Sequence, residues 1–141
     1  MENRSFYTRN GWKGENYTSS LTTKDIGKIV RKYVKETYSE YKFSITTSSS
    51  EIAVNLMEAP ESIFNKGLEK NYMPINNHSI SSNKELNSIG KSVLNDLYSL
   101  LKSYNYNDSD AMIDYFDTNF YIYLRIGKWD KPFKIVKKQA D

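Results

Sequence analysis

Residues 41–56 read YKFSITTSSSEIAVNL, and this stretch decides the fold. Apolar residues occupy every second position on each side of a polar turn: Tyr41, Phe43 and Ile45 before it, and Ile52, Val54 and Leu56 after it. Side chains two residues apart lie on the same face of a strand, so this alternation separates an apolar face from a polar one. The stretch predicts a β-hairpin with one buried face.

The segment before the hairpin has helical periodicity. Thr22 and Asp25 have the spacing of a capping box, in which each residue's side chain accepts a hydrogen bond from the other's backbone N–H. Apolar positions then follow the i, i+3, i+4 rule on one face: Ile26, Ile29, Val30, Tyr33 and Val34. We predict an amphipathic helix from about Thr22 to about Tyr38.

The segment after the hairpin contains a second long helical pattern. Ser82 and Glu85 match the Ser-x-x-Glu capping box, and the pattern ends near Tyr104. Its apolar stripe comprises Leu86, Ile89, Val93, Leu94, Leu97, Leu100 and Leu101. We predict a helix that begins at this capping box.

The rest of the chain supplies shorter elements. Pro60 favours a short helix that ends near Gly67, and residues 71–80 are predicted to be irregular. Further strands are predicted at Ala111–Phe116, Phe120–Ile126 and Phe133–Val136. Together these elements predict an α+β fold, an antiparallel β-sheet of about four strands with two main α-helices packed on one face.

The chain divides into three parts by composition. Residues 1–20 form an aromatic-containing N-terminal arm, residues 21–136 a single α+β domain, and residues 137–141 a basic C-terminal tail. The first residues have no apolar core of a secretory signal, and no apolar run approaches the roughly 20 residues of a membrane helix. We expect a cytoplasmic protein of the bacterial host cell with no membrane partner.

Composition narrows the chemistry. The 141 residues carry a formal net charge of +3, contain no cysteine, and include one histidine, His78. These counts exclude disulfides, thiolate zinc sites and His-pair metal motifs. No phosphate-binding glycine loop or nucleophile motif is present. We therefore expect a binding protein rather than an enzyme, with no catalytic residue, cofactor or metal, and a structural role for His78.

A basic stripe lies on the predicted first helix. Its members share the face opposite the apolar residues: Lys24, Lys28, Arg31, Lys32 and Lys35. Such a stripe is either the solvated face of an amphipathic helix or a contact for phosphates or an acidic protein surface. A second basic cluster near the C-terminus has the same two interpretations: Lys128, Lys131, Lys134, Lys137 and Lys138.

An acidic group and a tyrosine pair are the other candidate partner-binding residues. The carboxylates are Asp108, Asp110, Asp114 and Asp117. Loop chemistry explains them, and a negative patch for a basic partner is the alternative; the glycine and glutamate of a calcium loop are missing. Tyr121 and Tyr123 point outward if Phe120 points inward. They form an interaction face, or another element such as the N-terminal arm covers them.

Several stretches together resemble the large polyvalent protein-associated domain family. They are LTTKDIGKIVR at 21–31, KFSI at 42–45, SYNYNDSD at 103–110, DYFDTNFY at 114–121 and IGKWDKPF at 126–133. The resemblance covers about residues 20–136 and carries no catalytic residues. It implies a context of phages, plasmids and conjugative elements, where small proteins similar in size and composition include type II anti-CRISPR proteins.

The resemblance implies a specific hypothesis. The chain would bind a bacterial RNA-guided DNA endonuclease, a CRISPR type II effector with its guide RNA, and block target cleavage by direct protein contact. It would obstruct a nuclease domain or occlude the DNA channel, and the mildly basic charge favours the first. The alternative is a nucleic-acid-binding accessory module of a mobile element that uses the basic helix face, so direct nucleic-acid binding stays open.

Overall fold

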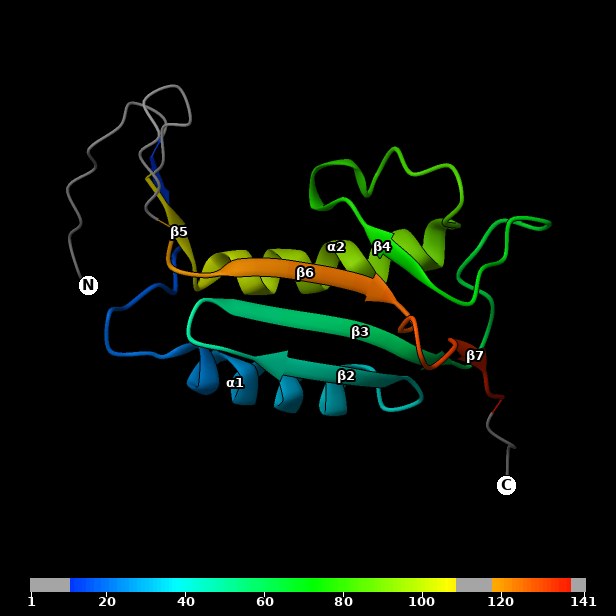
Figure 1. Cartoon of the computed structure of the whole chain (residues 1–141), viewed down its shortest axis with the longest axis horizontal. Coiled ribbons are helices and arrows are strands. Elements are labelled where there is room, and N and C mark those ends of the chain that lie inside the picture. The colour runs from blue at the N-terminus through cyan, green and yellow to red at the C-terminus, as the bar shows by residue number, and fades with distance from the viewer. Residues whose placement is uncertain (1–10, 109–117, 138–141) are drawn as a thin grey trace.

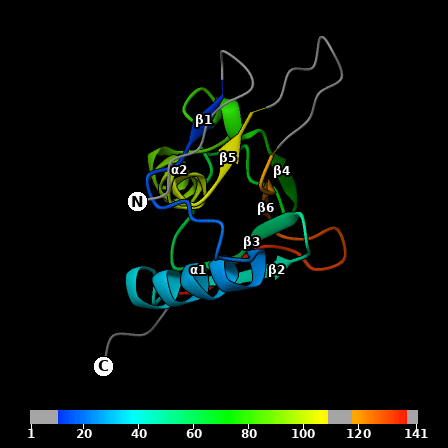
Figure 2. The same cartoon turned by 90° about the vertical axis from the view of Figure 1, so that its left-hand side faces the viewer.

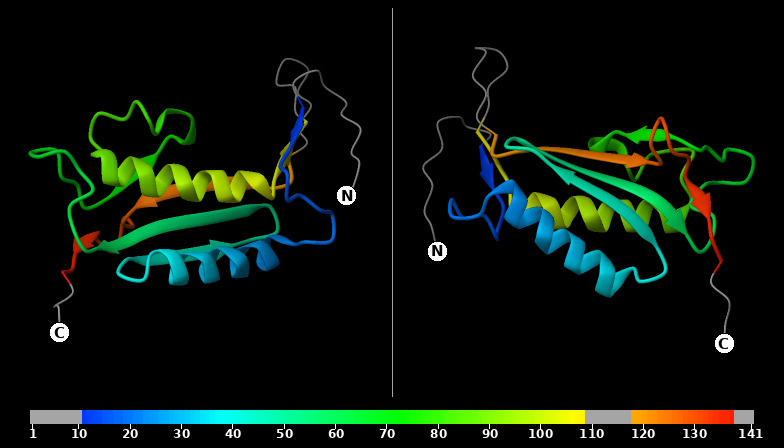
Figure 3. Two further views of the ribbon diagram at one scale, coloured as in Figure 1. Left: turned by 180° about the vertical axis from the view of Figure 1, so that it is seen from behind. Right: turned by 60° about the horizontal axis from the view of Figure 1, so that its bottom comes forward.

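The computed structural model describes residues 11–108 and 118–137, and within them two helices cover one face of a central sheet (Figures 1 and 2). The sheet strands, in spatial order, are β2 (Lys42–Thr47), β3 (Glu51–Ala59), β6 (Tyr121–Ile126) and β4 (Met73–Ile75). A further short strand, β7 (Lys134–Ile135), pairs with the end of β3. The helices are α1 (Thr23–Thr37) and α2 (Ser88–Ser103). The predicted α+β class and the placement of both helices on one face are confirmed; Figure 3 shows the helices from behind.

The sheet is mixed, which corrects the prediction of an antiparallel one. β2 and β3 form the predicted antiparallel hairpin, and β4 is antiparallel to β6. β3 and β6, however, run parallel, with Ile52 opposite Ile122 and Leu56 opposite Ile126. The chain between them includes α2, which returns it to the end of the sheet where β3 begins, as a parallel pair requires. Alternation of apolar residues defines the faces of a strand but not the direction of its neighbours.

β3 is buried on both faces. Ile52, Val54 and Leu56 face the helices and are at most 1% exposed. Ala53 and Asn55 face the opposite side and are also buried. β3 is therefore the centre of the hydrophobic core, and the second face of the hairpin is less exposed than alternation alone predicts.

The first helix forms as predicted. The Thr22 hydroxyl accepts from the Asp25 N–H at 3.1 Å, and the Asp25 carboxylate accepts from the Thr22 N–H at 3.0 Å, so the capping box is confirmed. Ile26, Val30 and Val34 are buried against the sheet. The helix ends at Thr37, within one residue of the predicted position.

The second helix begins later than predicted, so the prediction of a capping box at Ser82 and Glu85 is wrong. Asn87 caps the helix, and its side-chain oxygen accepts from the Gly90 N–H at 2.9 Å. The Ser82 hydroxyl instead donates to the Ser79 carbonyl, and Glu85 forms an ion pair with Lys70 at 3.3 Å. The apolar stripe from Val93 onward lies in the helix as predicted.

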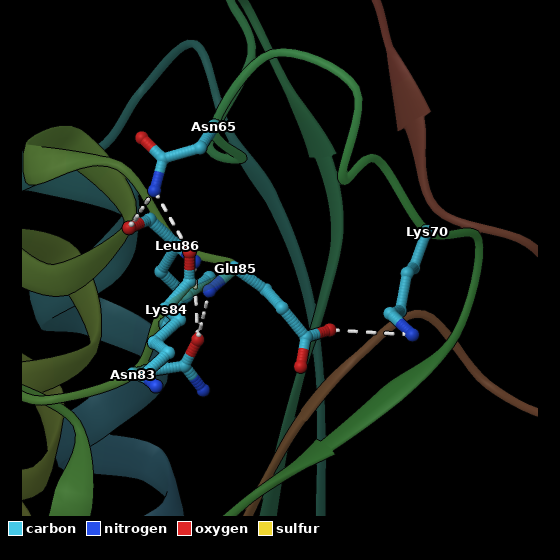
Figure 4. A network of polar contacts seen from close by, with 6 residues as sticks. All are labelled: Asn65, Lys70, Asn83, Lys84, Glu85 and Leu86. Carbon is cyan, nitrogen blue, oxygen red and sulfur yellow. Dashed lines mark hydrogen bonds and ion pairs between the residues drawn. The ribbon is translucent and has the colours of Figure 1, made fainter.

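Asparagine side chains explain the late start (Figure 4). Asn83 accepts from the N–H groups of both Glu85 and Leu86, which holds the backbone in a turn. Asn65 donates to the carbonyls of Lys84 and Leu86 from the other side. Backbone groups that a helix would use are thereby paired elsewhere, because short polar side chains compete with helical hydrogen bonds.

Other predictions differ from the structure in short elements. No helix forms at 60–67; instead Phe64 forms a β-bridge with Leu86. The segment 71–80, predicted to be irregular, contains β4 and a 3₁₀ turn at Asn77–Ser79. The predicted strand Ala111–Phe116 lies outside the described residues.

The described part of the N-terminal segment packs on the end of α2. β1 (Trp12–Lys13) pairs with β5 (Tyr106–Asn107), and neither strand was predicted. At Gly14 a Cβ atom would lie 2.3 Å from the Ser103 carbonyl oxygen, so only glycine allows this approach. The two-stranded ribbon thus fixes the start of the described chain beside the C-terminal end of α2.

Asparagine side chains also replace a neighbouring strand beside the first half of β6. β4 pairs with β6 only between Leu124 and Ile126. The buried Asn105 side chain accepts from the Phe120 N–H at 3.1 Å and donates to its carbonyl at 2.9 Å. Asn77 donates to the Ile122 carbonyl at 2.9 Å. These bonds satisfy backbone groups at a strand edge that would otherwise be open to another chain.

We predict that Asn105→Ala lowers the free energy of unfolding by about 2–4 kcal/mol, because it leaves both buried backbone groups of Phe120 without their partner. Urea unfolding measures the change. The matched control is Asn16→Ala, which removes an exposed side-chain hydrogen bond to Ser103 and is expected to cost less than about 0.5 kcal/mol. Equal losses for the two variants would contradict the edge role of Asn105.

The start of α2 has its own test. Asn87→Ala removes the cap and the side-chain bonds to the Ser62 and Phe64 carbonyls, so we expect a loss of about 1–3 kcal/mol in the same assay. Ser82→Ala is expected to cost less than about 0.5 kcal/mol, because Ser82 is exposed and precedes the helix. A larger loss for Ser82→Ala than for Asn87→Ala would restore the predicted capping box.

Candidate functional site

The basic helix face consists of exposed side chains along α1. It includes the predicted partner-binding residues Lys28, Arg31, Lys32 and Lys35, together with Lys24. Arg31 also has a structural contact, because its guanidinium donates to the Ile45 carbonyl of β2 at 2.8 Å. The lysines of this face therefore carry its free positive charge, while Arg31 ties the helix to the sheet.

The acidic candidates do not form a surface patch within the described residues. Asp108 is 1% exposed, so its carboxylate is not presented to a partner in this structure. Asp110, Asp114 and Asp117 lie outside the described residues. Within residues 11–108 and 118–137, no group of three or more histidine, aspartate or glutamate side chains could hold a metal ion.

The tyrosine pair lies on the sheet face that the helices leave uncovered. Tyr121 is 48% exposed and Tyr123 is 40% exposed, which confirms their predicted outward orientation. Arg125 follows on the same face and lies over the Tyr123 ring, 5.3 Å from its centroid. The Arg125 guanidinium also donates to the Asn55 side-chain oxygen at 3.4 Å. We call Tyr121, Tyr123 and Arg125 the β6 ladder.

A hollow of about 330 Å³ lies at the Arg125 end of the β6 ladder. It is lined by Thr46, Asn55, Tyr72, Arg125, Lys128, Trp129 and Asp130. Trp129 is 84% exposed, the largest exposed fraction of any large hydrophobic side chain in the described residues. We call this the tryptophan hollow.

The turn that carries Trp129 is held in place by its backbone. Lys128 and Lys131 exchange two backbone hydrogen bonds, at 2.8 and 3.1 Å. Gly127 has φ +68°, and a Cβ there would lie 2.1 Å from the Asn71 carbonyl oxygen, so this position requires glycine. Phe133, on the far side of the turn, is buried against Phe64. The exposure of Trp129 is therefore a property of an anchored turn.

A second hollow, of about 320 Å³, lies at the other end of the β6 ladder. Its lining includes Trp12, His78, Tyr98, Lys102, Tyr121 and Tyr123. The Lys102 ammonium lies 4.8 Å from the centre of the Trp12 ring. Exposed aromatic rings and cations thus occur at both ends of β6.

Sequence reasoning found the two tyrosines but missed Trp129, Tyr72 and Arg125 as surface residues. Their grouping depends on the loop from residue 71 packing beside the turn at 127–131, which is a long-range contact. A tryptophan between charged residues, in the run Gly127–Lys131, was the available signal.

Two further tyrosines, Tyr33 and Tyr38, bind one carboxylate where α1 meets α2. The hydroxyls of Tyr33 and Tyr38 donate to the same oxygen of Asp96, at 2.7 and 2.5 Å. The hydrogen bond to Asp96 is the main cause that raises the pKa of Tyr33, and burial is the main cause that raises the pKa of Tyr38. Both hydroxyls therefore stay protonated at neutral pH, as donors that join the helices rather than as nucleophiles.

These shifts predict a loss of stability in alkali. Above pH 10 an unfolded tyrosine loses its proton while Tyr33 and Tyr38 keep theirs, so the free energy of unfolding falls as pH rises. We expect urea unfolding at pH 8 and pH 11 to show this fall. Tyr38→Phe should lower stability at pH 8 and make the fall smaller. An equal fall in both proteins would contradict the role of Tyr38.

Comparisons with known proteins give one match. A family model described as Large polyvalent protein associated domain 29 matches residues 21–125. Neither the curated proteins nor the solved structures give a significant match. None of the helices in the described ranges has the length and apolar character needed to cross a membrane.

Proposed function

The chain belongs to the large polyvalent protein associated domain 29 family, a membership that associates it with phages and mobile elements, and from this premise we propose that it is a counter-defence protein. It binds a bacterial RNA-guided DNA endonuclease, a CRISPR type II effector with its guide RNA, in the host cytoplasm. Binding blocks target cleavage, and the chain performs no chemistry of its own.

The basic helix face is the observation that supports this proposal. Lys28, Lys32 and Lys35 are exposed on the side of α1 that does not pack on the sheet. Nuclease domains that use divalent cations hold them with carboxylates, so the mouth of such a site is acidic. A lysine-bearing helix complements that surface in charge. In this arrangement α1 obstructs the approach of a nuclease domain to the target strand.

The same face also favours a second function. Lysines three and four residues apart along a helix can contact successive phosphates of a duplex. In this alternative the chain is a nucleic-acid-binding accessory module of a mobile element. Its affinity would fall steeply with salt, whereas the counter-defence role requires a complex with the effector protein.

The test is co-elution with guide-loaded bacterial type II effectors, together with a target-cleavage assay. We expect a stable complex and reduced cleavage. A triple variant is expected to weaken binding at least tenfold: Lys28→Glu, Lys32→Glu and Lys35→Glu. Arg31 is left unchanged because it also bonds β2. The control carries the same charge change at lysines outside both basic clusters: Lys66→Glu, Lys84→Glu and Lys91→Glu.

Three outcomes are distinguishable. Loss of effector binding in the first variant but not in the control supports the counter-defence role. Duplex binding that the first variant abolishes, without co-elution, supports the accessory module instead. Neither co-elution nor inhibition with any of these effectors would overturn the counter-defence proposal.

A further inference from the structure

The uncovered sheet face presents aromatic rings in a row. Tyr121 and Tyr123 of the β6 ladder are about half exposed, and Trp129 is almost entirely exposed at its end. Tyr72, 39% exposed, lines the same hollow as Trp129. Large exposed rings on regular or anchored backbone are rare on a surface that contacts only water. In proteins that bind single strands, exposed aromatic rings are the surfaces on which unpaired bases stack.

Cations accompany the rings along their whole length. Lys102 lies at the Trp12 end, Arg125 in the ladder and Lys128 in the tryptophan hollow. Among the residues that the structure describes, the acidic side chains near this row include Glu51, opposite Tyr121 in the sheet, and Asp130. Lys102, Arg125 and Lys128 outnumber Glu51 and Asp130, and Arg125 is already oriented by Tyr123 and Asn55. This charge complements a phosphate backbone.

The dimensions fit a few nucleotides. From Tyr121 to Arg125 a strand rises roughly 13 Å at about 3.3 Å per residue. The tryptophan hollow, about 330 Å³, lies at the lower end of the range for small-ligand sites and fits one planar base. Asn55, in its floor, uses its oxygen for Arg125 and its amide N–H for the Ser44 carbonyl. Both polar groups of the Asn55 side chain therefore already have partners within the protein. We expect the site to bind through base stacking and phosphate contacts rather than to recognise a base sequence.

From these observations we propose that the β6 ladder and the tryptophan hollow bind a single-stranded nucleic acid. Bases stack on Tyr123 and Trp129, and Lys128 contacts the backbone phosphates. This site goes beyond the counter-defence role and does not rest on it, because it uses the sheet face and not the basic helix face of α1.

The test is fluorescence anisotropy of the full chain with a labelled oligothymidylate of about 12 nucleotides. We expect binding, and weaker binding to a duplex of equal length, whose bases are not free to stack. Trp129→Ala should weaken binding at least tenfold. Because the Trp129 side chain is almost entirely exposed, we expect its removal to leave the fold intact. The matched apolar control is Leu68→Ala, which removes another exposed side chain that lines neither hollow.

The charge contribution has a separate readout. Lys128→Gln should reduce the slope of log affinity against log salt by about 0.7, the value for one phosphate contact with a single strand. Lys66→Gln, at an exposed lysine outside both hollows, should leave the slope unchanged. If Lys128→Gln leaves the slope of log affinity against log salt at its wild-type value, Lys128 does not contact a phosphate of the bound strand.

Two results would overturn the proposal. One is no binding of oligothymidylate at moderate salt, and the other is binding that Trp129→Ala leaves unchanged. If oligothymidylate does not bind but Trp129→Ala breaks co-elution with the effector, the face docks a protein and not a nucleic acid. If the oligonucleotide binds and no effector does, the counter-defence proposal fails while this one stands.

Discussion

The parallel register of β3 and β6 is the constraint on which the rest of the structure depends. It sets Ile52 beside Ile122 and Leu56 beside Ile126 on the face that the helices cover. The same register leaves Tyr123 and Arg125 on the other face. Because side chains alternate along a strand, a slip of one residue would bury the tyrosine and expose the core. Core packing and the candidate binding face are thus two consequences of one pairing.

Side chains pair with backbone groups on both sides of this sheet. Arg31 of α1 donates to the outer strand β2, Asn105 pairs with Phe120 directly before β6, and Asn77 donates to the Ile122 carbonyl in the first half of β6. A single buried amide replaces a neighbouring residue at Phe120, because it offers one donor and one acceptor in the geometry of a peptide group. Such bonds leave fewer backbone groups open for pairing with another chain.

Local patterns predicted what depends on local chemistry. The capping box at Thr22, the apolar face of α1 and the faces of β2, β3 and β6 follow from periodicity within a few residues. The direction of β6 could not be predicted this way, since it depends on where α2 returns the chain. The start of α2 was mispredicted because Ser82 and Glu85 matched a capping motif, while Asn83 and Asn87 compete for the same backbone groups and prevail.

The candidate site residues also differ in whether local sequence patterns could predict them. Outward tyrosines on β6 were predictable from alternation, and exposed lysines on α1 from helical periodicity. The burial of Asp108 was not, because it depends on how the segment after α2 folds back. Nor was the tryptophan hollow, which forms where the turn at 127–131 meets the chain at Asn71. Surfaces assembled from distant segments carry no local signature.

The proposal that the uncovered face of the sheet binds a single-stranded nucleic acid is tested most directly by amide chemical-shift mapping by NMR. The chain, labelled with ¹⁵N, is titrated with oligothymidylate and the shifted backbone amides are assigned. We expect the largest changes at Tyr121–Arg125 and in the turn from Gly127 to Lys131. Changes confined to the lysines of α1, or no changes at all, would contradict it.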